Sequence, residues 1–356
     1  MTTHRPGPVL GGYGAGTAAG LIWGLAFLIP VLLHGWGAVT VTAGRYLAYG
    51  ALSLVLFALG GAALRRIARV HWRPAVLFAV TGNVGYYLLL VLGIELAGAP
   101  VTNIVIGCIP VSMAVVGNLL RPSYPWRRLA LPIVLVTVGM LVVNVLELTG
   151  SAPTHTGSLT TKALGLLAAL AAVVLWTWYG LANATFLAEH PELPLAGWST
   201  VVGLATGAVT LAALPLAAAT HQLDGPAGSG SLPALVVASL VLGILVSWGA
   251  TALWNVASAR LTPTAAGMLI NFETLAGFAY IYAALADWPP VGQLLGFALI
   301  LAGVVLIVRL PTATPTAPPS GDQPHPPLTL AAPPAAVPPP GSERSDRAVT
   351  GKDSRP

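Results

Sequence analysis

Ten apolar stretches, each close to the length of a membrane span, fill the sequence from residue 11 to residue 309. A helix needs about 20 apolar residues to cross a hydrocarbon core of roughly 30 Å. The predicted spans cover residues 11–33, 37–60, 74–97, 100–120, 129–147, 163–187, 195–219, 232–256, 262–284 and 290–309. Of 356 residues, 56% are hydrophobic and only 8% are charged, which excludes an ordinary soluble domain. Isolated strands leave backbone groups unpaired in lipid, so we expect an all-α integral membrane protein.

The charged loops alternate between the two sides of the membrane. Arginines follow the even-numbered spans two, four, eight and ten: Arg65, Arg66, Arg69, Arg73, Arg121, Arg127, Arg128, Arg260 and Arg309. The loops on the other side carry almost no Lys or Arg, with Lys162 as the exception. Because positive loops stay on the cytoplasmic side, we expect a multi-pass protein of the bacterial inner membrane with both termini in the cytoplasm.

The second group of five spans repeats features of the first group. Trp23 recurs as Trp176, and the triplet Ala43-Gly44-Arg45 recurs at the same offset as Ala196-Gly197-Trp198. Because five is an odd number, a second five-span copy must be inverted in the membrane. The arginine-rich loops of the first copy correspond to arginine-free loops of the second, as an inverted duplication requires. Inverted repeats are typical of transporters that bind a solute near the bilayer midplane.

We therefore predict three segments. Residues 11–147 form a first five-helix repeat and residues 163–309 form a second, inverted one. Residues 310–356 are rich in Pro, Ala, Thr and Ser and lack an apolar period, so they are predicted to be a disordered tail.

Charged side chains inside apolar spans are costly and therefore need a reason. Arg45 in span two either fixes helix packing or contacts an anionic group of a solute, and Glu95 in span three is its candidate partner. Glu273 lies near the middle of span nine, where a carboxyl could couple proton movement to transport or be held in a fixed hydrogen bond. Pro110, in the middle of span four, is predicted to bend its helix.

Aromatic and amide side chains share faces of three further spans. These groups are Trp176, Tyr179 and Asn183 on span six, Trp248, Thr251 and Asn255 on span eight, and Asn83, Tyr86 and Tyr87 on span three. Such faces are suited to a solute cavity, where rings pack and amides orient the ligand. The alternative, an interfacial belt of aromatic residues, fits Trp36, Trp72, Trp126 and Trp288 better. The candidate contacts are Tyr86, Trp176, Tyr179, Asn83, Asn255, Trp23 and Trp248.

Catalytic and cofactor-binding motifs are absent from the sequence. It contains no zinc-protease motif, nucleophile elbow or phosphate-binding loop, and its lone Cys108 excludes an intrachain disulfide. We therefore expect no enzyme, cofactor, metal or nucleic-acid partner. The expected partners are a small-molecule solute and the lipid bilayer, and a homodimer is left open.

These features resemble the drug/metabolite transporter superfamily, and within it the ten-span proteins with two EamA-type repeats. The resemblance covers about residues 15 to 309 and depends on motifs in sequence order: Trp23-Gly24, Ala43-Gly44-Arg45, Pro110, Leu261-Thr262-Pro263, Phe272-Glu273, Gly292-Gln293-x-x-Gly296 and Gly303-Val304-Val305. Two positions differ from the family pattern, because Thr274 replaces a common Pro and Asp287-Trp288 replaces a common Gly-Glu pair. Tyr86, Trp176-x-x-Tyr179 and Trp254-Asn255-Val256 are similar to the bacterial aromatic amino-acid exporters.

The resemblance implies a carrier that exports a small organic solute, such as an amino acid, a related metabolite or a drug, by alternating access. In this hypothesis the two five-helix halves rock around a midplane cavity, and Glu273 exchanges a proton. Two alternatives are an importer of the same fold and a membrane receptor or scaffold that recruits partners through its tail.

Overall fold

The structure is a computed structural model that describes residues 7–33, 35–150, 158–223 and 230–311. Within these ranges every regular element is helical, and ten stretches are long and apolar enough to cross a membrane. They are Val9–Ile29, Ala38–Leu59, Gly61–Ala97, Val101–Leu120, Trp126–Val145, Leu159–Glu189, Leu195–Ala219, Leu232–Arg260, Pro263–Leu285 and Val291–Arg309. We number them spans 1 to 10. The predicted number of spans is confirmed, whereas the predicted tail lies outside the described residues beyond residue 311.

Five of the spans consist of one helix and five are interrupted. The single helices are α3 (Ala38–Leu59), α8 (Trp126–Gly150), α9 (Leu159–Glu189), α10 (Leu195–Ala219) and α15 (Val291–Arg309). Span 1 consists of α1 (Gly7–Trp23) and α2 (Leu25–Leu32), span 4 of α6 (Ala99–Ile106) and α7 (Ile109–Leu120), and span 9 of α13 (Pro263–Leu269) and α14 (Asn271–Leu285). Spans 3 and 8 each contain a π-helix: α4 (Gly61–Phe78), η1 (Ala79–Val84) and α5 (Gly85–Ala97), and α11 (Leu232–Val241), η2 (Leu242–Gly249) and α12 (Ala250–Arg260).

Side-chain caps mark several helix starts at the membrane boundary. The hydroxyl of Ser158 accepts a hydrogen bond from the Thr161 amide at the start of α9, and Thr262 accepts one from the Ala265 amide at the start of α13. Pro263 follows Thr262 directly, in the first turn, where its missing N–H costs nothing. These caps satisfy amides that have no partner within the helix.

The predicted loop between spans 2 and 3 is instead helical, which corrects the expected start of span 3. Gly61 has φ of 63°, a conformation open to glycine, and it turns the chain directly from α3 into α4. Ile67 is buried against α10, while Arg65 and Arg66 are exposed. The sequence-based boundary was wrong because the arginines lie on one side of an amphipathic helix, not in a loop. His71 has non-helical φ/ψ, three residues before Pro74, and the helix is kinked there.

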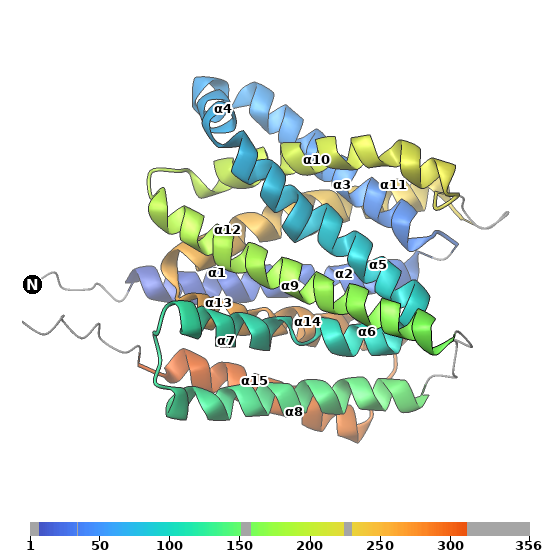
Figure 1. Cartoon of the computed structure of the whole chain (residues 1–356), viewed down its shortest axis with the longest axis vertical. Helices are drawn as coiled ribbons and strands as arrows, with labels where there is room; N and C mark the ends of the chain where they lie inside the picture. The colour runs from blue at the N-terminus through green and yellow to red at the C-terminus, as the bar shows by residue number, and fades with distance from the viewer. Residues whose placement is uncertain (1–6, 34, 151–157, 224–229, 312–356) are drawn as a thin grey trace, which may run out of the picture. The chain divides into compact units, whose positions relative to one another are not determined.

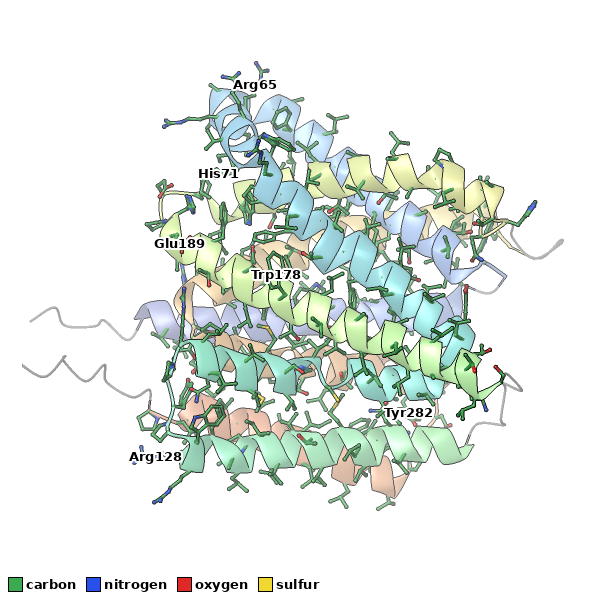
Figure 2. The ribbon with its side chains drawn as sticks, in the orientation of Figure 1. Arg65, His71, Arg128, Trp178, Glu189 and Tyr282 are labelled. Atoms are coloured by element: carbon green, nitrogen blue, oxygen red, sulfur yellow. The ribbon has the colours of Figure 1, made fainter. Side chains whose placement is uncertain are left out.

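The loops predicted to be positive lie at one end of the helix bundle. Figure 2 shows Arg65 and Arg128 toward the same end, and Tyr282 lies nearer the other. We call the end that carries Arg65, Arg66, Arg69, Arg73, Arg121, Arg127, Arg128, Arg260 and Arg309 the arginine end.

The extensive helix contacts join the first five spans to the last five. α8 packs along α15, and α3 packs along α10 (Figure 1). α5 packs along α9, α1 along α12 and α7 along α13. This set of pairings is unchanged when each of the first five spans is exchanged with the span five later, such as span 3 with span 8. The pairing of α5 with α9 then becomes the pairing of α12 with α1, and each of the other three pairings becomes itself. Corresponding spans, such as span 3 and span 8, run in opposite directions (Figure 1).

Glycines allow these helices to approach closely. A Cβ on Gly207 of α10 would lie 2.7 Å from the Cα of Gly50 in α3, and a Cβ on Gly24 would lie 2.7 Å from the Cβ of Ala276 in α14. Small residues permit such contacts in lipid, where close van der Waals packing replaces the hydrophobic effect between helices. Gly24 of span 1 and Gly207 of span 7 therefore lie at helix contacts.

Candidate functional site

Three tryptophans from three spans meet at the centre of the described bundle. The ring centroids of Trp23 and Trp254 are 5.5 Å apart, those of Trp176 and Trp254 are 6.1 Å apart, and those of Trp23 and Trp176 are 6.4 Å apart. Tyr179 extends the group on α9, with its ring 5.9 Å from that of Trp176. Tyr86 of α5 packs against the same cluster. We call these five residues the aromatic cluster.

Two oppositely charged side chains belong to the same region. The Nε of Arg45 donates a hydrogen bond to the Ser247 hydroxyl at 2.8 Å, and its guanidinium lies 5.3 Å from the centroid of the Tyr46 ring. Glu273 lies in the first turn of α14, where the helix dipole favours a carboxylate. The charges of Arg45 and Glu273 interact electrostatically with each other, and both also interact electrostatically with the Tyr86 hydroxyl.

The helix interruptions explain why Glu273 can occupy this position. Span 9 breaks at Ile270, so α14 begins in the interior of the bundle and its N-terminal dipole is directed there. Span 1 breaks at Gly24, opposite Ala276 and Gly277 of α14. Span 4 breaks at Gly107 and Cys108, between α6 and α7, and Pro110 lies in the first turn of α7. Broken helices with termini near the midplane are a recurring way to build a transporter site.

Both π-helices carry candidate residues. Asn83 of η1 donates from its amide nitrogen to the Thr206 hydroxyl at 3.1 Å, and Trp248 of η2 donates from its indole nitrogen to the Thr200 hydroxyl at 3.1 Å. Ser247, the partner of Arg45, also belongs to η2. A π-turn shifts the helix register by one residue and is frequent at functional sites. Here it directs polar side chains of spans 3 and 8 toward spans 7 and 2.

A small cavity connects Arg45 with the end of the bundle opposite the arginine end. It has a volume of about 170 Å³, and its lining includes Trp36, Thr42, Arg45 and Tyr87. The indole N–H of Trp36 is buried there and has no hydrogen-bond partner in the described part of the chain. The cavity therefore brings polar groups of Trp36, Thr42 and Arg45 to one internal surface.

The candidate Asn255 lies in a separate, buried network. Its carbonyl oxygen accepts from Asn183 at 2.9 Å, and its amide nitrogen donates to the Ser199 hydroxyl at 2.9 Å and to the Leu195 carbonyl at 3.4 Å. The indole of Trp198 donates to Asn183 at 3.0 Å. All polar atoms of the Asn255 side chain are thus paired with protein, so in this conformation the residue joins helices and has no free group for a solute.

Glu95 also lies apart from the cluster. Its side chain is exposed near the end of α5, and no ion pair joins it to Arg45 within the described ranges. The expected partnership is therefore replaced by the contact of Arg45 with Ser247 and its interaction with Glu273.

The list of candidate contacts left out Ser247 and Trp254 of this site and Trp198 of the separate Asn255 network. Ser247 gave no signal, because a serine in a span is common and its partner lies on a distant helix. Trp198 did carry one, since it occupies the repeat position of Arg45. Trp254 stood next to the candidate Asn255, but it lies on the side of α12 that faces Trp23 and Trp176. In the described part of the chain, no group of three or more His, Cys, Asp or Glu side chains has the arrangement of a metal site.

Three comparisons with known proteins bear on this arrangement. The family model of the EamA-like transporter family matches residues 163–309. Inner membrane protein YtfF of Escherichia coli (strain K12) is 37% identical over 301 residues, which are 82% of this chain and 92% of that protein. A crystal structure of a protein with 20% sequence identity matches this fold with a TM-score of 0.66, over 85% of this chain and 97% of the other. The chain therefore belongs to the EamA-type transporters of the drug/metabolite transporter superfamily.

Proposed function

We propose that this membrane transporter exports a small zwitterionic solute of the amino-acid type across the bacterial inner membrane by alternating access. The observation that carries the proposal is the pair of opposite charges, Arg45 and Glu273, beside one aromatic cluster in the interior of an otherwise apolar bundle. An unpaired charge is costly in this environment, whereas two opposite charges remain compensated. A solute with a carboxylate and an ammonium group would complement both.

Each group has a distinct part in the proposal. Arg45 receives the carboxylate, because a guanidinium binds carboxylates in a planar, two-point geometry. Glu273 receives the ammonium group of the solute or, in the absence of solute, a proton. This exchange couples the export of the solute to the movement of the proton. Trp23, Trp176 and Tyr86 pack against the apolar part of the solute, and an indole face also attracts a cation.

The helix pairing supports the inverted repeat that this mechanism uses. η1 and η2 start at Ala79 and Leu242, and the breaks of spans 4 and 9 precede Pro110 and Glu273. Leu242 lies 163 residues after Ala79, and Glu273 lies 163 residues after Pro110. The pairs Trp23 with Trp176 and Arg45 with Trp198 are 153 residues apart, and the longer connection between spans 7 and 8 than between spans 2 and 3 accounts for the difference. Two copies related by inversion would explain this agreement. With the arginine end in the cytoplasm, the cavity at Arg45 lies toward the outer face of the membrane.

Efflux from proteoliposomes tests the proposal. The purified full chain is reconstituted, the vesicles are loaded with radiolabelled amino acids, and efflux is measured with and without a proton gradient. We expect Trp176→Ala and Glu273→Gln to reduce efflux at least tenfold. Trp126→Ala and Glu192→Gln remove the same groups from exposed positions and should leave efflux unchanged. Wild-type rates in both site variants would refute the site assignment, and a solute that moves only inward would refute the export direction.

A further inference from the structure

A second cavity lies on the outside of the bundle, along α9 and between α4 and α7. Its volume is about 830 Å³. Its lining is mostly apolar and includes Leu77, Phe78, Val116, Leu120, Trp178 and Leu181. Within the described part of the chain, this lining contains no residue of the aromatic cluster, and it contains neither Arg45 nor Glu273. We call this cavity the α9 groove.

The α9 groove is next to the aromatic cluster, on the side that faces away from the centre of the bundle. Phe78, which lines the groove, packs edge-on against Tyr179, with ring centroids 5.7 Å apart. Along α9 the groove extends from Val173 to Glu189. Figure 2 shows Glu189 at the arginine end of α9 and Trp178 farther along the same helix. The sixteen residue steps from Val173 to Glu189 span about 24 Å of α-helix, which exceeds the roughly 15 Å of hydrocarbon in one leaflet and reaches into the headgroup region.

Two guanidinium groups lie at the mouth of the groove. Arg73 lines it, and Arg121 donates from Nη2 to the hydroxyl of Thr185, another lining residue, at 3.1 Å. The carboxylate of Glu189 lines the same end. Arg73, Arg121 and Glu189 together therefore give the mouth of the groove a net charge of +1. A phosphate diester carries one negative charge and accepts paired hydrogen bonds from guanidinium groups. One anionic headgroup would therefore neutralise the mouth.

A second outer cavity of the molecule differs from the α9 groove in the charge at its mouth. A similar outer cavity of about 690 Å³ lies between α14 and α15, near the opposite end. Its only charged lining residue within the described ranges is Asp287, which would repel a phosphate. The charge at the mouth therefore distinguishes the α9 groove from this second cavity.

We propose that the α9 groove binds one anionic phospholipid. An acyl chain lies along Leu181 and Val116, and the phosphate lies between Arg73 and Arg121 at the arginine end. The bound lipid would support Phe78 from outside and thereby the packing of Tyr179. This site is independent of the proposed solute, so its test measures lipid binding and no transport.

Native mass spectrometry of the delipidated full chain, titrated with dioleoyl phosphatidylglycerol, tests the assignment. Dioleoyl phosphatidylethanolamine and dioleoyl phosphatidylcholine provide the same tails with other headgroups. We expect one phosphatidylglycerol to bind at least tenfold more tightly than either alternative. The double variant Arg73→Gln/Arg121→Gln should lose this preference, whereas Glu189→Gln should strengthen it by removing a repelling charge.

The matched control removes two arginines from the same end but away from the groove. Arg127 and Arg128 are exposed at the start of α8 and do not line the cavity. Arg127→Gln/Arg128→Gln should keep the full preference for phosphatidylglycerol. Equal loss in the two double variants would show general attraction to a basic surface and overturn the proposal. Equal binding of the three lipids by the unmodified chain, or tighter binding of phosphatidylethanolamine, would overturn it as well.

Discussion

Replacement of Asn255 by alanine distinguishes a structural amide from one that contacts the solute. The change deletes hydrogen bonds to Asn183 and Ser199 at 2.9 Å each and a longer one to Leu195. Interhelical hydrogen bonds in membrane proteins contribute about 0.6 kcal/mol on average and up to about 1.7 kcal/mol. Two good bonds therefore correspond to a loss of about 1–3 kcal/mol. Asn183 would lose an acceptor in a site where it is 1% exposed, which favours the upper part of this range.

The measurement has two parts, because a structural residue and a binding residue differ in what they change. The free energy of unfolding is determined in mixed detergent micelles, and KM for efflux is determined on the folded fraction. We expect the loss of stability with an unchanged KM. Asn144→Ala is the control, since within the described residues its amide donates one hydrogen bond, to the Met140 carbonyl one turn back in α8, and the change should cost less than about 0.5 kcal/mol. A raised KM with unchanged stability would refute the structural reading of Asn255.

Three further predictions follow from individual contacts. Gly207→Leu should destabilise the fold by about 1–3 kcal/mol, because its Cβ would lie 2.7 Å from the Gly50 backbone, whereas Gly14→Ala has open space and should be neutral in the same unfolding assay. Trp254→Phe should raise KM severalfold, because the Trp254 ring contacts Trp23 and Trp176, and it should cost about 1–2 kcal/mol from the cavity that a smaller ring leaves where Trp254 is 1% exposed. The indole N–H has no hydrogen-bond partner in the described part of the chain, and an unchanged KM in the efflux assay would contradict this prediction. Arg45→Lys and Arg45→Gln should both weaken binding of a labelled amino acid in a scintillation proximity assay, and Gln should weaken it more, because lysine loses the two-point geometry but keeps a charge opposite Glu273.

The sequence predicted the helices well because lipid imposes a simple rule. Each span must be about 20 apolar residues long, and the ten runs met that rule with limits close to the observed ones. The exception was α4, an amphipathic helix that was predicted to be a loop because it contains Arg65, Arg66 and Arg69. The hydropathy of a segment shows where the chain can enter lipid, but it does not show whether the flanking residues form a helix.

The candidate site was predicted in part. Helical spacing placed Trp176 and Tyr179 on one face, and the structure brings them together with Trp23 and Tyr86. The same spacing could not show which helix each face meets. Asn255 shares a face with Trp248 in the sequence, yet it pairs with Asn183 and Ser199, because the choice of neighbour depends on contacts between distant spans. The part of these residues in solute binding stays a prediction.

The distribution of helix interruptions suggests which parts of the bundle move. Spans 1, 3, 4, 8 and 9 are interrupted, and spans 2, 5, 7 and 10 are single helices that form the closely packed pairs α3 with α10 and α8 with α15. Rotation of residues 11–147 as one rigid body against residues 163–309 would separate both pairs together with the contact of Gly50 and Gly207. Bending of the interrupted spans at Gly24, η1, η2 and Ile270 would keep these pairs intact. We therefore expect alternating access to arise from bending of the interrupted helices around a frame of continuous ones, because the bends lie beside the residues that would bind the solute and the frame does not.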